Sequence, residues 1–351
     1  MKSFGIGIIG LGGMANAHIN GLRNIAGMRV AAICDVDAAA LERIGERLGI
    51  PADKRFADYG RLIEEADVDA VISVTPNVVH ADIMERCLKA RKPFLSEKPF
   101  TMNFEEAERL KALYDQAPVS AMIGFSYRYT PAFRYARELL RRGDIGDVRS
   151  FFVQYLQGWG SAAYRQPFVW RFDKAVTGTG TLGDLGAHMI DLAHYLVGSF
   201  RDVSAQLATF IPERNLPNSE ELVPVAVDDF ASFQARMANG AAGVFQTSRN
   251  CIGSGNQLEI SLYGDKGTLH ASTLRPDQVV LVRVDDDTGE LAEMRANVPQ
   301  RAKLTQWEDF ARMLNGEPSE GLPDFAAGFE NQKVLEAILQ ANETKRTVSC
   351  E

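Results

Sequence analysis

The feature that most constrains this chain is a strict alternation of short apolar strands and helices over its first 125 residues. We expect strands at 4–9, 28–34, 70–74, 93–96 and 119–125, and helices at 13–26, 38–48, 58–65, 78–90 and 104–115. The strand at 70–74 is almost continuously apolar, as a strand buried on both faces should be. Units that alternate at this length predict a doubly wound parallel sheet, and hence an α/β first domain over residues 1–125.

The pattern changes after residue 125. A helix over 130–142 starts with Thr130 and Pro131 and is expected to bridge two domains. Strands then dominate, at 148–154, 203–211, 225–237, 241–248, 258–263, 267–272 and 279–284. They predict an α+β second domain over 126–351, built on an open, mostly antiparallel sheet that is flanked by helices.

Four segments complete the expected second domain. One helix at 183–197 interrupts the strands, and residues 212–224 are expected to form an exposed loop. Helices at 304–314 and 325–342 close the chain, and the last of them can pack back on the first domain.

A glycine-rich turn, Gly10-Leu11-Gly12-Gly13-Met14-Ala15, directly follows the first expected strand. With a helix after it, this GxGxxA pattern places backbone N–H groups and a helix N-terminus at a pyrophosphate, as in a Rossmann domain. Asp35 ends the second strand, where an acid binds the ribose 2′-hydroxyl and repels a 2′-phosphate. Asp37 is the better candidate for capping the next helix. The predicted cofactor is NAD in preference to NADP, held by Gly10, Gly12, Gly13, Met14, Ala15 and Asp35.

Two further strand ends point to the same crevice, because open parallel sheets bind ligands at the carboxyl ends of their strands. They add Thr75, Pro76, Asn77, His80, Glu97 and Lys98 to the expected cofactor-binding residues. The first is Thr75-Pro76-Asn77, with His80 in the following helix. Thr75 and Asn77 can contact the ribose or the nicotinamide, although Asn77 is also a natural helix cap. The second is Glu97-Lys98-Pro99, where Lys98 is either an ordinary exposed lysine or a charged donor beside the reacting oxygen.

Residues 178–195 combine a glycine-rich approach with a helix that carries two stripes. One stripe is apolar, and the other consists of Asp184, His188, Asp191 and Tyr195. Two carboxylates and an imidazole on a mostly buried helix are unfavourable unless they are paired or functional. A hydrogen-bonded core histidine is the structural alternative. Three such groups in register beside flexible glycines favour a reaction site.

Composition excludes several other classes of protein. A net charge of −8 and a pI near 5.3 disfavour a nucleic-acid surface. The longest apolar runs are too short for a transmembrane helix, so no membrane association is expected. Four scattered cysteines without a CxxC pair argue against a thiolate zinc site and fit a cytoplasmic protein.

Together these motifs resemble the glucose–fructose oxidoreductase / inositol dehydrogenase / rhizopine-catabolism (Gfo/Idh/MocA) family over nearly the whole chain. The matching patterns are GxGxxA, Thr-Pro-Asn with a following His, Glu-Lys-Pro, and Asp-x-Gly-x-His-x-x-Asp. The resemblance implies that Lys98, Asp184 and His188 lie at the catalytic centre and that Asp191 contacts substrate hydroxyls. It also implies a sheet domain that mediates dimers or tetramers. The glycine run here, at 178–181, is looser than the family's three consecutive glycines.

The residue chemistry agrees with an oxidation of a secondary hydroxyl of a sugar or cyclitol to a ketone. His188 suits the base because imidazole titrates near working pH, and Asp184 can fix its tautomer. Lys98 can stabilise the developing alkoxide and share the proton relay. The order in which Lys98 and His188 accept the proton stays open at this point, as does the choice among cyclitols, pyranoses and anhydro-sugars. Few Lys and Arg in the substrate segments disfavour sugar phosphates.

The expected substrate-binding residues are Lys98, Tyr127, Arg128, Trp159, Asp184, His188 and Asp191. Gly158 and Gly160 indicate a loop around Trp159, although a core tryptophan is the alternative. Two other functions are the alternatives to a sugar dehydrogenase. A divalent-metal site at Asp184, His188 and Asp191 conflicts with the dinucleotide crevice, so no metal is expected. A catalytically silent dinucleotide-binding regulator conflicts with the presence of all three catalytic residues. A broad sheet needs both faces covered, which predicts a homodimer or homotetramer.

Overall fold

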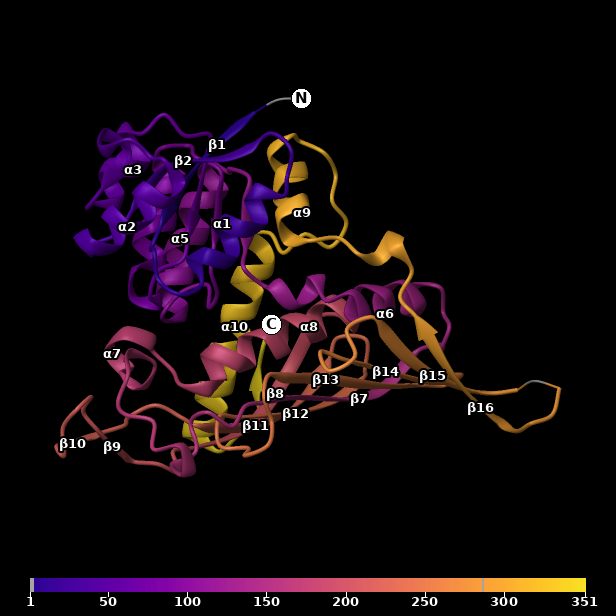
Figure 1. Ribbon diagram of the computed structural model, residues 1–351. Coiled ribbons are helices and arrows are strands. Elements are labelled where there is room, and N and C mark those ends of the chain that lie inside the picture. Colours follow the sequence, from indigo (N-terminus) through magenta and orange to yellow (C-terminus); the bar gives the residue numbers. More distant parts are fainter. Residues whose placement is uncertain (1–2, 286) are drawn as a thin grey trace. The chain divides into compact units, whose positions relative to one another are not determined.

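The protein is described by a computed structural model, which covers residues 3–285 and 287–351 (Figure 1). Its contacts divide the chain into two compact units. The first unit is Met1–Phe125 with Thr305–Gln332, and the second is Ser126–Leu304 with Lys333–Glu351. The chain therefore returns to the first unit once before it ends.

The first unit is built on a six-stranded sheet in the order β3-β2-β1-β4-β5-β6, and every pair in it is parallel. The strands are β1 (Phe4–Ile9), β2 (Met28–Cys34), β3 (Arg55–Phe56), β4 (Ala70–Ser73), β5 (Phe94–Ser96) and β6 (Ala121–Ile123). The strand order reverses between β1 and β4, which is where doubly wound sheets bind dinucleotides. The predicted doubly wound parallel sheet is confirmed. The short strand β3 escaped prediction because two residues carry no periodicity.

Helices join these strands: α1 (Ala15–Arg23), α2 (Ala38–Leu48), α3 (Tyr59–Glu65), α4 (His80–Lys89) and α5 (Phe104–Gln116). The returning segment adds α9 (Gln306–Leu314) and the start of α10 (Phe325–Thr344). Trp307 of α9 packs directly on α1, where a Cβ at Gly21 would lie only 2.1 Å from the indole ring. The contact therefore requires a glycine in the last turn of α1.

The second unit is built on a nine-stranded sheet in the order β16-β15-β14-β13-β7-β12-β11-β8-β17. Only the β7–β12 pair among these neighbours is parallel, so the prediction of a mostly antiparallel sheet is confirmed. The strands are β7 (Val148–Leu156), β8 (Phe200–Ala208), β11 (Phe230–Met237), β12 (Ala242–Ser248), β13 (Gln257–Gly264), β14 (Gly267–Ser272), β15 (Gln278–Val284), β16 (Leu291–Asn297) and β17 (Val348–Ser349).

Helices cover one face of this sheet. Figure 1 shows α6 (Pro131–Arg141) and α8 (Ala187–Leu196) on the same side of the strands. Side chains alternate accordingly along β7, where Phe151, Val153 and Tyr155 are buried while Phe152 and Gln154 are exposed. We call the side that presents Phe152 the open face of the sheet.

Residues 212–224 are largely exposed, as expected, but the prediction of a loop without strands is wrong. The segment contains a two-stranded antiparallel hairpin of β9 (Glu213–Asn215) and β10 (Leu222–Pro224). Arg214 in β9 is buried, and its guanidinium donates to the carbonyl oxygens of Gly160 and Gln166 over 2.5 and 3.0 Å. Polar composition alone could not distinguish this anchored hairpin from a solvated loop.

A buried ion pair fixes α8 to the segment that precedes α6. Arg128 donates through Nε and Nη2 to both carboxylate oxygens of Asp191 over 2.6–3.0 Å, and both side chains are buried. Burial disfavours the Arg128 cation, but the Asp191 carboxylate outweighs this effect, so the pKa of Arg128 is raised. The substrate-binding roles expected for these two residues stay predictions, and the structure adds a second role. They bind each other and brace the fold.

This ion pair yields a stability prediction. Removing one partner leaves an uncompensated buried charge, which typically costs about 3–5 kcal/mol. Arg128→Met and Asp191→Leu should each lower the free energy of urea unfolding by about that amount. The double variant should recover most of the loss, because an apolar pair of similar volume replaces both charges. Single variants that lose less than about 1 kcal/mol, the range of an exposed pair, would contradict this account.

Candidate active site

The glycine-rich turn of the first unit presents open backbone. Gly10 has a φ of +88°, and a Cβ there would lie 2.5 Å from the carbonyl oxygen of Val74, so only glycine fits. Cβ atoms added at Gly12 or Gly13 would meet nothing within 4 Å, and both residues are exposed. A pyrophosphate can therefore approach the backbone N–H groups that precede α1. These residues fit a dinucleotide.

Asp35 is fixed beside this turn. One carboxylate oxygen accepts the Leu11 N–H over 2.6 Å, and the other accepts the Asp37 N–H over 2.9 Å. Asp37 instead caps α2 through the Ala39 N–H, so the capping alternative does not account for Asp35. The next residue, Val36, is 90% exposed. The carboxylate is thus held at the end of β2 next to the glycine turn.

His80 joins the two other strand-end motifs of the first unit. The imidazole is fully buried, with Nε2 3.0 Å from the Thr75 carbonyl oxygen and Nδ1 2.8 Å from the Pro99 carbonyl oxygen. Burial lowers its pKa. The side chain thus ties the turn after β4 to the turn after β5. Asn77 opens a short turn, Asn77–Val79, and Val79 takes the N-cap position of α4.

Glu97 is held in place by residues of α1 and α9. The His18 Nε2 lies 2.9 Å from Glu97 Oε1, and the Trp307 indole N–H donates to His18 Nδ1 over 3.4 Å. An indole nitrogen only donates, so Nδ1 accepts and Nε2 carries the proton that reaches Glu97. A Cβ at Gly124 would lie 2.8 Å from the Glu97 carboxylate. Half-buried Lys98 follows this immobilised side chain.

In the second unit, Asp228 clamps the glycine-rich segment before α8. Its two carboxylate oxygens accept the Gly180 and Leu182 N–H groups, each over 2.7 Å. A Cβ at Gly180 would lie 1.8 Å from the Asp228 carbonyl oxygen, and Gly178 has a φ of +75°. A π-helical turn over Leu182–Gly186 follows, and α8 continues it. The glycines therefore permit a close backbone approach that starts this helix.

The helix start presents Asp184 and His188. Asp184 lies in the π-helical turn, and its Oδ2 accepts a hydrogen bond from Arg249 Nη2 over 2.8 Å. His188 lies near the start of α8, is 6% exposed, and meets the Tyr127 ring edge-on with centroids 4.6 Å apart. The structure thus brings a carboxylate, an imidazole and a phenol to one end of the second unit.

A chain of polar side chains continues from Tyr127. Its hydroxyl is 2.5 Å from that of Tyr155 and accepts from the Asn256 amide over 2.6 Å. Gln157 donates to Asn256 Oδ1 over 2.8 Å and accepts from the Trp159 indole over 2.6 Å. Hydroxyl, amide and indole groups in such a chain suit a ligand with many hydroxyls.

Trp159 lies in a loop, as expected, and packs on an apolar cluster. Its ring is 5.5 Å from that of Phe172, which is buried with Val225 and Val227. Sequence reasoning missed Tyr155, Gln157, Asn256 and Arg249. Tyr155 and Gln157 adjoin Trp159 and could have been included with it. Nothing local marks Asn256 or Arg249.

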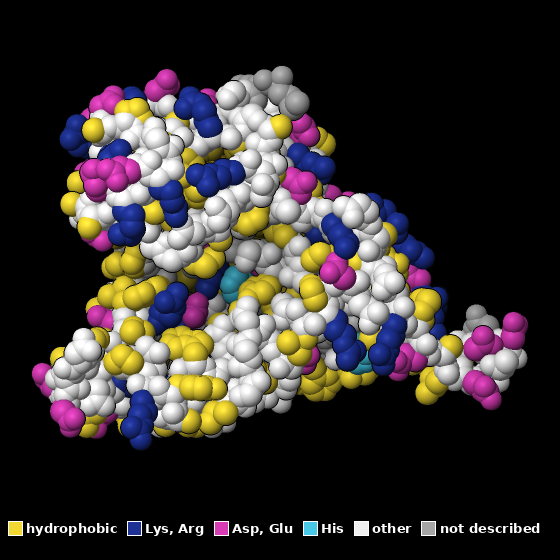
Figure 2. Space-filling view, in the orientation of Figure 1, with side chains coloured by type: hydrophobic (Ala, Val, Ile, Leu, Met, Phe, Trp, Pro, Cys, Tyr) yellow, Lys and Arg dark blue, Asp and Glu magenta, His cyan; other side chains and the backbone are white. Residues whose placement is uncertain are grey.

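Two further findings concern metal binding and membrane-spanning helices. Among residues 3–285 and 287–351, no group of three or more His, Cys, Asp or Glu side chains is placed to hold a metal ion. No helix in those ranges is long and apolar enough to cross a membrane. Basic and acidic side chains are interspersed over the surface that Figure 2 shows.

Comparisons with known proteins agree with these features. Residues 4–125 match the oxidoreductase family with an NAD-binding Rossmann fold, and residues 133–270 match the GFO/IDH/MocA C-terminal domain. The chain is 33% identical to levoglucosan dehydrogenase of Pseudarthrobacter phenanthrenivorans, over 96% of this chain and 88% of that protein. It is 28% identical to glucose-6-phosphate 3-dehydrogenase of Bacillus subtilis, over 98% of each protein.

Solved structures give the same result. The chain is similar to levoglucosan dehydrogenase in complex with NADH and L-sorbose, with a TM-score of 0.92, 28% identity and complete coverage of both chains. The sequence motifs, the two folds and these comparisons together place the protein in the GFO/IDH/MocA family of NAD-binding oxidoreductases.

Proposed function

We propose that this protein is an NAD-dependent dehydrogenase that oxidises a secondary hydroxyl of a sugar or cyclitol to a ketone. The observation that carries this proposal is the end of the second unit, where Asp184 and His188 adjoin a chain of hydroxyl, amide and indole groups. These side chains offer a polyhydroxylated ring many hydrogen-bond partners beside a group that can accept a proton. Relatives named as dehydrogenases of levoglucosan and myo-inositol support the substrate class.

The first unit supplies the cofactor site in this proposal. The turn from Gly10 to Ala15 receives the pyrophosphate, while Asp35 favours NAD over NADP. When bound, NAD would accept the hydride from the substrate carbon. Thr75, Pro76 and Asn77 line the nicotinamide side together with Glu97, and His80 holds the carbonyl oxygens of that region in place.

The catalytic groups come from both units. Lys98 follows β5 at the carboxyl end of the parallel sheet, the edge at which such sheets bind ligands. We place it beside His188 and Asp184 at the reacting hydroxyl. His188 or Lys98 accepts the hydroxyl proton, and the Lys98 ammonium stabilises the alkoxide that forms. Asp184 orients the reacting groups.

An uncharged substrate is favoured over a sugar phosphate. The buried guanidinium groups near the site have internal partners, because Arg249 pairs with Asp184 and Arg214 donates to two backbone carbonyls. Neither is therefore held ready for a phosphate. Cyclitols, pyranoses and anhydro-sugars remain the candidates, and the Trp159 ring offers an apolar surface to any of them.

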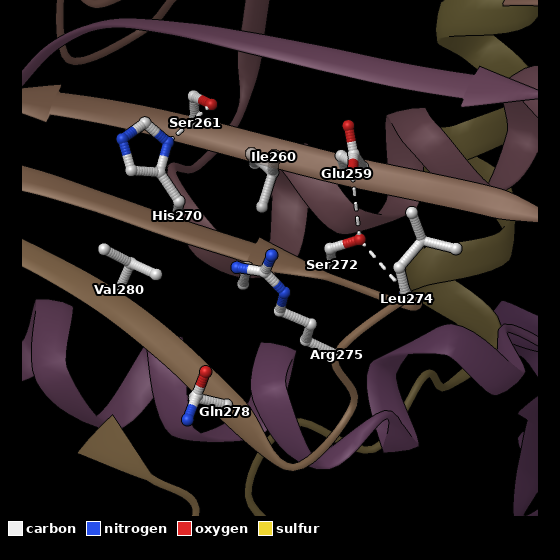
Figure 3. A pocket seen from close by; sticks show the side chains of 10 residues that line it. Glu259, Ile260, Ser261, His270, Ser272, Leu274, Arg275, Gln278 and Val280 are labelled. Atoms are coloured by element: carbon white, nitrogen blue, oxygen red, sulfur yellow. Dashed lines mark hydrogen bonds between the residues drawn. The ribbon is translucent and has the colours of Figure 1, made fainter. Parts of the chain in front are cut away.

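A second copy of the chain is proposed to cover the open face. Phe152, Val244 and Tyr263 are 48, 39 and 38% exposed there, and they lie on the adjacent strands β7, β12 and β13. Figure 3 shows a hollow on the neighbouring strands β13, β14 and β15, where Ser261 contacts His270 and Ser272 contacts Glu259. An exposed apolar patch with polar residues around it is typical of a subunit interface. We propose a homodimer or homotetramer.

A cytoplasmic location completes the proposal. Cys34, Cys87 and Cys251 are free thiols, as is usual for proteins of a reducing compartment.

The cofactor preference can be tested by exchanging the charge at the end of β2. Asp35→Ser with Val36→Arg should shift the ratio of kcat/KM from NAD towards NADP, because a 2′-phosphate then meets a cation instead of a carboxylate. Absorbance at 340 nm with each dinucleotide measures the ratio. Val36→Arg alone is the control and should keep the NAD preference. A parent protein that already prefers NADP would contradict the role of Asp35.

The catalytic assignment can be tested with levoglucosan, myo-inositol and D-glucose as the substrate panel. Lys98→Ala and His188→Ala should each lower kcat by about 10²–10⁴-fold with little change in NAD affinity, since each removes a positioned acid–base or charged group. Asp184→Asn should lie between these variants and the parent. The parent's rate should rise with pH as the base loses its proton.

Exposed Lys266 provides the control, because Lys266→Ala should keep the parent kcat. If folded His188→Ala kept near-parent kcat, His188 would be structural, and the proton relay would rest on Lys98 alone.

The assembly can be tested by light scattering at micromolar concentration. The parent should be a dimer or tetramer, and Phe152→Glu should dissociate it because a charge would be buried on the open face. Ile252→Glu, a charge at an exposed loop residue, is the matched control and should leave the assembly intact. A monomeric parent would refute the proposed interface.

A further inference from the structure

We infer that Arg249 is a positioning residue of the oxidation, which fixes the Asp184 carboxylate and the Trp159 ring together. The inference rests on the proposed function, because it takes Asp184 and His188 as parts of the reaction site. Arg249 lies 65 positions from Asp184 in sequence, directly after β12. No motif of the sequence points to it.

The first contact is with the carboxylate. Arg249 is 1% exposed, so its cation requires internal partners. Nη2 donates to Asp184 Oδ2 over 2.8 Å and lies 3.4 Å from the Gly180 carbonyl oxygen. Nη1 lies 3.4 Å from the Arg171 carbonyl oxygen. The guanidinium therefore joins Asp184 to the glycine-rich approach at Gly180 and to the preceding segment at Arg171.

The second contact is with the loop that carries Trp159. The guanidinium carbon lies 5.3 Å from the centroid of the Trp159 ring, within the range of a cation–π interaction. The Gly160 N–H donates to the Arg249 carbonyl oxygen over 3.0 Å, and a Cβ at Gly160 would lie 2.9 Å from the Arg249 Cβ. Arg249 thus seats this loop with both its backbone and its side chain.

The two contacts have separable consequences. The positive charge offsets the Asp184 carboxylate, which otherwise would favour the protonated form of a neighbouring imidazole. The planar shape of the Arg249 guanidinium, by contrast, sets the position of the carbonyl groups and of the Trp159 ring. The ammonium of a lysine cannot reproduce this shape. The charge of Arg249 should therefore govern the pH dependence of the rate, whereas the shape of its guanidinium should govern the affinity for the substrate.

Two substitutions separate these effects in the panel assay with NAD. Arg249→Met should lower kcat/KM by about 10²-fold, because the reacting groups lose their fixed geometry. It should also move the rising limb of the pH–rate profile upwards by about one pH unit, since Asp184 loses the neighbouring positive charge of Arg249. Arg249→Lys should keep the limb near its parent position while raising KM.

Arg214→Met is the matched control. Arg214 is also buried, lies 4.1 Å from the Phe172 centroid and donates to the same loop at Gly160, but its hydrogen bonds go to backbone carbonyl oxygens and not to Asp184. Its loss should change KM and stability without moving the pH profile. A purely structural role of Arg249 would make the two methionine variants alike.

The outcomes distinguish this inference from the proposed function. If His188→Ala loses its rate while folded Arg249→Met keeps the parent pH limb and KM, the Arg249 inference alone fails. If Arg249→Lys shifts the limb as far as Arg249→Met does, charge is not the determinant and the inference also fails.

A further variant covers the case in which Arg249→Met folds poorly. Arg249→Met with Asp184→Asn removes both charges of the pair, so the double variant should lose much less than the sum of its single effects. Additive losses would overturn the inference. A crystal structure of folded Arg249→Met gives a test independent of turnover: Asp184 and Trp159 should leave their positions, and unchanged positions would refute the role.

Discussion

The proposed reaction site of the second unit depends on the close backbone approach between Gly180 and Asp228. The Asp228 carboxylate takes the N–H groups of Gly180 and Leu182, which an ordinary loop would leave to water. No side chain larger than hydrogen fits at Gly180. This clamp starts the π-helical turn that carries Asp184 and leads into α8 with His188. A single buried carboxylate therefore determines where both polar groups stand.

Internal pairing allows so many polar groups to be buried. Arg249 pairs with Asp184 and Arg128 pairs with Asp191, so these two buried cations each meet an anion within hydrogen-bond distance. The first unit uses imidazoles in the same way. His18 and His80 hold the turns around Lys98 from two sides, one through the Glu97 carboxylate and one through the Thr75 and Pro99 carbonyl oxygens. In each unit the residues around the reacting groups are fixed before any ligand binds, which is what precise positioning requires.

Periodicity in the sequence predicted the fold because most strands have one face or both faces buried. In the sequence, strands of the parallel sheet are runs of apolar residues, and strands of the second sheet alternate between apolar and polar residues. Prediction failed at β16, where nearly all side chains are exposed and no alternation exists, and at the hairpin that Arg214 anchors. Local motifs identified Lys98, Asp184 and His188 as candidates.

Partners that are distant in sequence could not be identified in this way. Arg128 and Asp191 were each recognised as polar residues near the site, but 63 positions separate them, and only the fold pairs them with each other. Arg249 was missed for the same reason. Long-range pairing is decided by topology, which composition and spacing do not encode.

The central proposal is that Lys98 of the first unit and His188 of the second act on the same hydroxyl. The most direct measurement is a double-mutant cycle on kcat/KM with Lys98→Ala, His188→Ala and the double variant. If the two groups share one proton and one developing charge, the loss in the double variant should fall short of the sum of the single losses by about 1 kcal/mol or more. Losses that add to within about 0.5 kcal/mol would show that the two groups act independently, and would contradict the account.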